Sequence, residues 1–132
     1  EGKRLIVIDD SIVRGTTTKG KIKSLREAGA KEIHMRVACP PIKHPCFYGV
    51  DFPTHEELLA NQLDSVEEIR KYLKVDTLGY ISLEGLLSCA SLPPDHYCTA
   101  CWSGQYKIPI CSVVNKFSME RHQMQLFDEH EM

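Results

Sequence analysis

The chain has 132 residues, of which 42% are hydrophobic and 26% are charged, and its formal net charge is −2. This length suits one domain, and the apolar fraction is enough for a packed core, which excludes global disorder. The small net charge does not indicate nucleic-acid binding, and no apolar run approaches the roughly 20 residues that cross a bilayer. Neither nucleic acid nor a membrane is therefore an expected partner.

The N-terminal end is typical of a piece of a longer protein. The sequence has no initial methionine, and the first recognisable element already begins at Lys3. The short apolar run that follows ends at two acids and does not have the pattern of a signal peptide. We therefore expect a reducing compartment, the cytoplasm, for this chain.

The first elements predict a strand–helix–strand unit of an α/β fold. Residues 4–8 are aliphatic and β-branched, which is typical of a strand buried on both faces of a parallel sheet. A polar loop over residues 11–17 follows, and Thr17 or Thr18 can cap the helix after it. Residues 33–38 form the next predicted strand, which is expected to lie parallel to the first.

Two patterns of local capping predict helices in the middle of the chain. After an irregular loop rich in proline, glycine and aromatic residues, Thr54 and Glu57 form a capping-box pattern. Ser65 and Glu68 repeat this pattern, and the apolar spacing behind them predicts a helix that ends near Leu73.

Two adjacent prolines divide the last part of the chain. Before them we expect a short strand over residues 78–81 and a helix over residues 82–90. The predicted organisation is a first unit over residues 1–92 and an irregular Cys-x-x-Cys segment without helical spacing over residues 93–110. Residues 111–132 are polar and are expected to be a flexible tail.

The strongest local signal is the stretch LIVIDDSIVRGTT at residues 5–17. In it a strand ends in two carboxylates, Asp9 and Asp10, and a loop with one glycine leads into a helix N-terminus. Free backbone N–H groups there bind anions, and Gly15 lets the backbone approach a phosphate without a Cβ. The acids suit sugar hydroxyls or Mg²⁺. The alternative is that they only cap a loop at the end of a core strand.

This stretch resembles the motif with which type I phosphoribosyltransferases bind 5-phosphoribosyl 1-diphosphate (PRPP). The resemblance implies that Asp9 and Asp10 hold the ribose 2′- and 3′-hydroxyls and Mg²⁺, and that the loop cradles the 5′-phosphate. The substrate-binding residues that it implies are Asp9, Asp10, Ser11, Ile12, Val13, Arg14, Gly15, Thr16 and Thr17.

Further motifs resemble the amidophosphoribosyltransferase family of purine synthesis, and together they cover residues 3–108. They are LREAGAKE at 25–32, PPIKHPCFYG at 40–49, EELLAN at 56–61, SVEEIR at 65–70 and SLEGLL at 82–87. The resemblance implies that residues 1–92 are the C-terminal part of a parallel-sheet type I phosphoribosyltransferase domain. No family resemblance covers residues 111–132.

The family makes 5-phosphoribosylamine, because ammonia released from glutamine displaces pyrophosphate at C1 of PRPP. In the family, glutamine hydrolysis and the pyrophosphate-binding loop belong to segments that would precede Glu1 here. The resemblance therefore implies that this chain holds no catalytic residue and is inactive alone. It also implies a homo-oligomeric enzyme and purine nucleotides as inhibitors.

The cysteines are a second candidate for chemistry. They are Cys39, Cys46, Cys89, Cys98, Cys101 and Cys111. In a reducing compartment a Cys-x-x-Cys pair indicates a metal or redox site and not a disulfide, although the pair at 98 and 101 is a weak signal by itself. Three thiolates would suit Zn²⁺ or an iron–sulfur cluster, and either normally needs a fourth ligand.

The family resemblance specifies these ligands further. Cluster-bearing members use a cysteine in the His-Pro-Cys loop and a C-terminal Cys-x-x-Cys pair, which implies Cys46, Cys98 and Cys101 as three ligands of a 4Fe-4S cluster. The fourth ligand would lie upstream of residue 1. The alternative is three unmetallated thiols. Cys39 and Cys89 are expected to be buried as small hydrophobic residues.

Other interpretations of the whole chain are open. A type I phosphoribosyltransferase that acts on a base would share the phosphate loop. So would a non-catalytic, PRPP-binding regulatory module. A small zinc module is harder to reconcile with the strand, loop and helix around Asp9 and Asp10.

Overall fold

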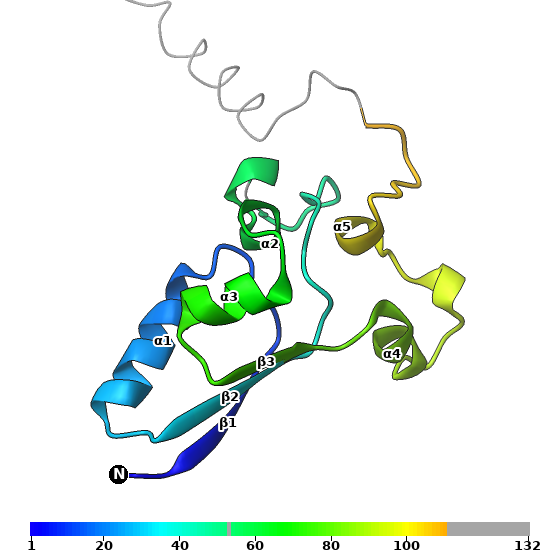
Figure 1. Cartoon of the computed structure of the whole chain (residues 1–132). Coiled ribbons are helices and arrows are strands. Elements are labelled where there is room, and N and C mark those ends of the chain that lie inside the picture. Colours follow the sequence, from blue (N-terminus) through cyan, green and yellow to red (C-terminus); the bar gives the residue numbers. More distant parts are fainter. Residues whose placement is uncertain (53, 111–132) are drawn as a thin grey trace, which may run out of the picture.

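A computed structural model describes residues 1–52 and 54–110, and it shows a parallel α/β fold (Figure 1). The predicted tail over residues 111–132 lies outside the described residues. The sheet has three strands in the order β1-β2-β3. The elements are β1 (Arg4–Asp9), α1 (Thr16–Glu27), β2 (Glu32–Val37), η1 (His55–Glu57), α2 (Leu59–Gln62), α3 (Val66–Leu73), β3 (Thr77–Tyr80), α4 (Leu83–Ser88), η2 (Pro94–His96) and α5 (Ala100–Ser103).

The core lies on one side of the sheet, where α1 and α3 pack side by side (Figure 1). Ile33 and Met35 of β2 have no exposed surface, and Val37 is only 3% exposed. Ile22 of α1 and Leu73 of α3 cover these side chains within the same hydrophobic cluster. The predicted strand–helix–strand unit and the α/β class are therefore confirmed.

The opposite side of the sheet is uncovered within the described chain. Ile6 and Ile8 of β1 are 74% and 76% exposed, and they lie in register with His34 and Arg36 of β2. The expectation of a first strand buried on both faces is therefore wrong for this chain. Both neighbouring helices occupy the other side, so every second residue of β1 faces solvent.

The start of α1 also differs from the prediction. Neither Thr17 nor Thr18 caps the helix. Its N-cap is Gly15, which has a φ of 75°, and no side chain makes a capping hydrogen bond there. Thr18 is instead buried beneath the helix, at 5% exposure. Gly29, at a φ of 91°, follows the last turn, which is the usual place for a left-handed glycine.

The capping predictions elsewhere hold. The Glu57 carboxylate accepts a hydrogen bond from the Thr54 N–H at 3.0 Å, which starts η1. The Ser65 hydroxyl accepts one from the Glu68 N–H at 3.2 Å, which starts α3. In contrast, the one-turn helix α5 was not expected in the Cys-x-x-Cys segment.

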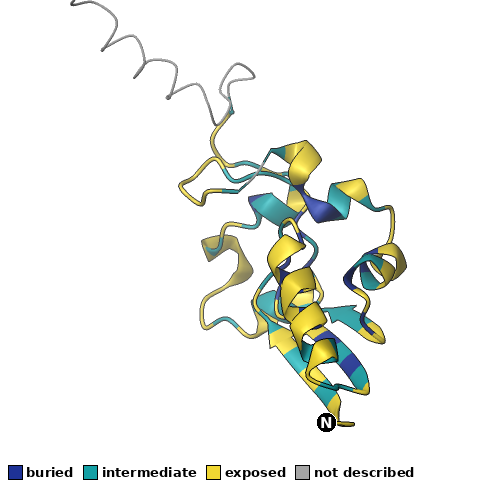
Figure 2. Cartoon of the chain, turned by 90° about the vertical axis from the view of Figure 1, so that its left-hand side faces the viewer, coloured by how far each residue is buried: buried dark blue, intermediate teal, exposed yellow. Residues whose placement is uncertain are grey.

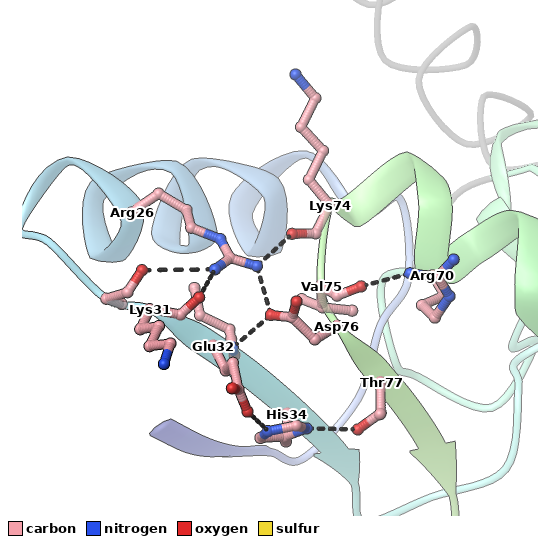
Figure 3. A network of polar contacts seen from close by, with 11 residues as sticks. Arg26, Lys31, Glu32, His34, Arg70, Lys74, Val75, Asp76 and Thr77 are labelled. Carbon is pink, nitrogen blue, oxygen red and sulfur yellow. Dashed lines mark hydrogen bonds and ion pairs between the residues drawn. The ribbon is translucent and has the colours of Figure 1, made fainter. Parts of the chain in front are cut away.

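A polar network joins the C-terminal part of α1 to the N-terminal ends of β2 and β3 (Figure 3). The Arg26 guanidinium of α1 donates to the Lys31 carbonyl and pairs with the Asp76 carboxylate ahead of β3. The same carboxylate accepts the Ile33 N–H of β2 at 2.7 Å. One helix and two strands are thereby joined through a single acid.

Within the described ranges, no helix has both the length and the apolar character that crossing a bilayer requires.

Candidate functional site

A pocket of about 360 Å³ lies at the carboxyl end of β1, next to the N-terminus of α1. It is lined by Asp9, Asp10, Ser11, Val13, Arg14, Gly15, Thr16, Thr17, Thr18, Lys21, Asp51 and Phe52. Eight of the nine predicted substrate-binding residues are in this lining, and the exception is Ile12. Ile12 points into the core, where it is 3% exposed.

The two adjacent acids of the pocket have different partners. The Asp9 carboxylate is 18% exposed and lies 3.6 Å from the Lys21 ammonium of α1. Asp10 is exposed, and its carboxylate accepts the Ser11 N–H at 2.7 Å. One carboxylate is therefore paired with a side chain of α1, and the other with the loop that follows it.

The other end of the pocket suits an anion. The first turn of α1 contains no acidic residue, and the first N–H groups of a helix have no partner within it. Thr16 and Thr17 are exposed there and add hydroxyl donors. Arg14 brings a cation to the same rim, where it pairs with Glu57 of η1 at 3.3 Å.

Four lining residues were not among the predicted substrate-binding residues, namely Thr18, Lys21, Asp51 and Phe52. Lys21 follows Thr17 by about one helical turn, so helical spacing alone could have placed it beside the loop. Asp51 and Phe52 come from the irregular loop that precedes η1. No local pattern places them, because their position depends on how this loop crosses the end of the sheet.

The Cys-x-x-Cys segment folds back onto the His-Pro-Cys loop. The Cys101 carbonyl accepts hydrogen bonds from the N–H groups of Lys43 and His44, at 3.1 and 3.0 Å. The Tyr106 hydroxyl donates to the Pro45 carbonyl at 2.6 Å. The three predicted ligand positions thus belong to two segments that are held together, although these segments are far apart in sequence.

The thiols of these segments influence one another. The pKa of Cys101 is raised to about 11, first by burial and to a smaller extent by the nearby Cys46 and Cys98. The Tyr106 pKa is raised for the same reasons, burial first and then the thiols around it. However, the described residues contain no group of three or more His, Cys, Asp or Glu side chains arranged to hold a metal ion.

The other cysteines divide as follows. Cys39 is buried at the end of β2, as predicted. Its pKa is raised by burial and then by the Asp10 carboxylate. Cys89 was expected to be buried but is exposed, because it ends the short helix α4. Cys111 lies outside the described residues.

Comparisons with known proteins agree on one family, although no protein-family model matches the chain. It is 48% identical over 121 residues to an amidophosphoribosyltransferase of Methanothermobacter thermautotrophicus, covering 92% of this chain and 25% of the relative. Its fold matches the glutamine PRPP amidotransferase from B. subtilis complexed with ADP and GMP, with a TM-score of 0.77 and 48% identity over 87% of this chain and 26% of the other.

A second solved structure, described as the allosteric regulatory enzyme of purine biosynthesis, matches with a TM-score of 0.76 and 48% identity over 86% of this chain and 25% of the other. The chain thus spans about a quarter of the length of its relatives. Sequence identity and shared architecture together place this chain in the amidophosphoribosyltransferase family, and its parallel α/β structure is part of a type I phosphoribosyltransferase fold.

Proposed function

We propose that this chain is the PRPP-binding part of a glycosyltransferase that forms 5-phosphoribosylamine from PRPP and ammonia derived from glutamine. This reaction is the first committed step of purine synthesis. The observation that carries the proposal is the pocket where two acids at the end of β1 face the N-terminus of α1, in a chain so similar to amidophosphoribosyltransferases.

The proposed tasks of the pocket are binding and orientation. The loop from Ser11 to Thr17 would hold the 5′-phosphate through N–H groups and hydroxyls. Asp9 and Asp10 would accept the ribose hydroxyls, so that C1 is presented to ammonia. None of these residues is proposed to hydrolyse glutamine or to transfer a proton.

Mg²⁺ is proposed as a companion of the substrate, where it would neutralise charge on the diphosphate. The two carboxylates of Asp9 and Asp10 are too few for a cage built by protein alone. This fits the usual behaviour of Mg²⁺, which is held by one or two carboxylates together with substrate phosphates and water. Asp9 and Asp10 are the residues that would contact it.

We also propose that Cys46, Cys98 and Cys101 are ligands of a 4Fe-4S cluster whose fourth ligand lies upstream of residue 1. The support is the folding of two cysteine-bearing segments onto each other and the mutual influence of their thiols. A cluster held there would join the two segments covalently and so add to stability.

Further proposals follow from the family. Purine nucleotides would inhibit the enzyme, for which the B. subtilis complex with ADP and GMP is the support. The enzyme would be a homo-oligomer in the cytoplasm. Residues 1–92 would belong to the phosphoribosyltransferase domain, residues 93–110 to the cysteine segment and residues 111–132 to a tail.

The test is PRPP-dependent formation of phosphoribosylamine by the full-length protein. Asp10→Asn should raise the KM for PRPP by at least about tenfold, because a charged acceptor contributes about 1.5–3 kcal/mol. Glutamine hydrolysis without PRPP should not change. Asp64→Asn, an exposed acid outside the pocket, is the matched control. Unaltered PRPP kinetics of Asp10→Asn would refute the assignment, and PRPP binding without product would favour a regulatory module.

A further inference from the structure

Lys21 is the basic residue that is most closely associated with the acids of the pocket. Its ammonium lies 3.6 Å from the Asp9 carboxylate. Charge-assisted hydrogen bonds are usually about 2.7–2.9 Å long, so this is an ion pair without a direct hydrogen bond. The Lys21 side chain is 58% exposed and the Asp9 side chain only 18%. The lysine is therefore largely in contact with solvent, whereas the acid is mostly covered by its surroundings.

The charges around the pocket explain why this lysine matters. Three carboxylates line a pocket that must accept an anion, those of Asp9, Asp10 and Asp51. The two basic residues in the lining are Arg14 and Lys21. Arg14 is paired with Glu57, which lies outside the lining. Lys21 is paired with a residue of the pocket itself, so its charge directly offsets one of the three acids.

The two acids of the motif are also held differently. Asp10 accepts the N–H and, at 3.4 Å, the hydroxyl of Ser11, so local backbone fixes its carboxylate. Asp9 depends on a side chain from another element, because Lys21 belongs to α1. The loop therefore positions one carboxylate, and a cation from α1 positions the other.

We propose that Lys21 is a positioning residue for PRPP, which keeps the Asp9 carboxylate directed into the pocket, where this carboxylate accepts the ribose hydroxyls. This inference rests on the proposed PRPP-binding function. It makes the contribution of Lys21 depend on Asp9 and not on Asp10.

A double-mutant cycle on the full-length protein tests this dependence. Lys21→Met should raise the KM for PRPP about tenfold, while kcat changes less than about twofold. In an Asp9→Asn background the same substitution should change KM less than about threefold, whereas in an Asp10→Asn background it should keep its full effect. Lys21→Arg should restore most of the affinity, since it keeps the charge.

Lys23→Met is the matched control. Lys23 lies on the same helix, pairs with Glu27 at 3.7 Å and is outside the pocket, so its removal should leave the KM unchanged. A KM that is unaltered in Lys21→Met, or an equal effect of Lys21→Met with and without Asp9, would overturn this inference alone. A wild-type protein that does not use PRPP would overturn the proposed function with it.

Discussion

Gly15 and Leu59 lie so close together that a Cβ on Gly15 would be 2.6 Å from Cδ2 of Leu59. Leu59 begins α2 and is only 2% exposed, so it has little room to retreat. The φ of Gly15 is 75°, a left-handed conformation that other residues adopt at a cost. The glycine of the phosphate loop is therefore required by packing and by its backbone, in addition to any approach of a phosphate.

This predicts opposite effects for two glycines of the same region. Gly15→Ala should lower the free energy of unfolding by at least about 1–2 kcal/mol, the cost of the left-handed conformation alone. Gly20→Ala, within α1, should raise it by about 0.5–1 kcal/mol, because no atom lies within 4 Å of its Cβ position and alanine favours the helix. Urea unfolding of both variants decides the question, and equal stabilities would contradict it.

Acid should weaken the network around Asp76. The pKa of this carboxyl is lowered, first by the Ile33 N–H and then by Arg26. Its ionised form therefore stabilises the fold above the ordinary carboxylate pKa of about 3.9, and this contribution is lost as the pH falls through the lower, folded-state pKa.

The variant Asp76→Asn should lower the Tm by about 4 °C at pH 7, a modest shift because the group is exposed. The difference from the wild type should shrink as the pH falls from about 5 to about 2.5. Asp95→Asn, in an exposed turn, should have no such effect. A difference in Tm that does not depend on pH would show that the carboxylate charge has no role.

The cysteine proposal predicts a selective loss of iron. Cys98→Ser or Cys101→Ser in the full-length protein should remove iron, sulfide and visible absorption, together with part of the stability. Cys89→Ser should keep all of them, because its exposed thiol donates to the Gly85 carbonyl of α4, within its own helix. Metal and sulfide analysis provides the measurement. A wild-type enzyme that is stable, active and free of iron would show that these are ordinary thiols.

The uncovered face of the sheet predicts self-association of the 132-residue chain by itself. Ile6 and Ile8 form an exposed apolar patch on its edge strand. Replacing both by threonine keeps the preference for a strand and removes much of the apolar surface. Sedimentation velocity should show concentration-dependent association for the wild type but not for the double variant. Val66→Thr, at a single 42% exposed position on α3, should behave as the wild type does.

Local patterns were sufficient to predict most elements of this fold. The aliphatic run before Asp9 gives β1, and Ser65 with Glu68 gives the start of α3, because both signals depend on residues close in sequence. The exposure of Ile8 could not be predicted in this way, since it depends on what covers the sheet. The presence of Lys21 in the pocket was not predicted, although this residue follows Thr17 by about one helical turn.

In the candidate site too, the residues that could be predicted are those that are close together in sequence. The loop around Gly15 could be recognised because its residues are contiguous, whereas Asp51 reaches the pocket only through the path of a long irregular loop. The start of α1 was misplaced for a related reason. Threonine is a good N-cap in general, but packing against Leu59 places a left-handed glycine at this position.

The paired hydrogen bonds to the Cys101 carbonyl have a consequence for measurement in solution. The amides of Lys43 and His44 both donate to this one acceptor, which belongs to a distant segment. Backbone amides exchange with deuterium when their hydrogen bond opens, so these two should exchange together, at a rate set by undocking of the cysteine segment. The exchange rates of these two amides would thus report how often the cysteine segment undocks, independently of iron content and of enzymatic turnover.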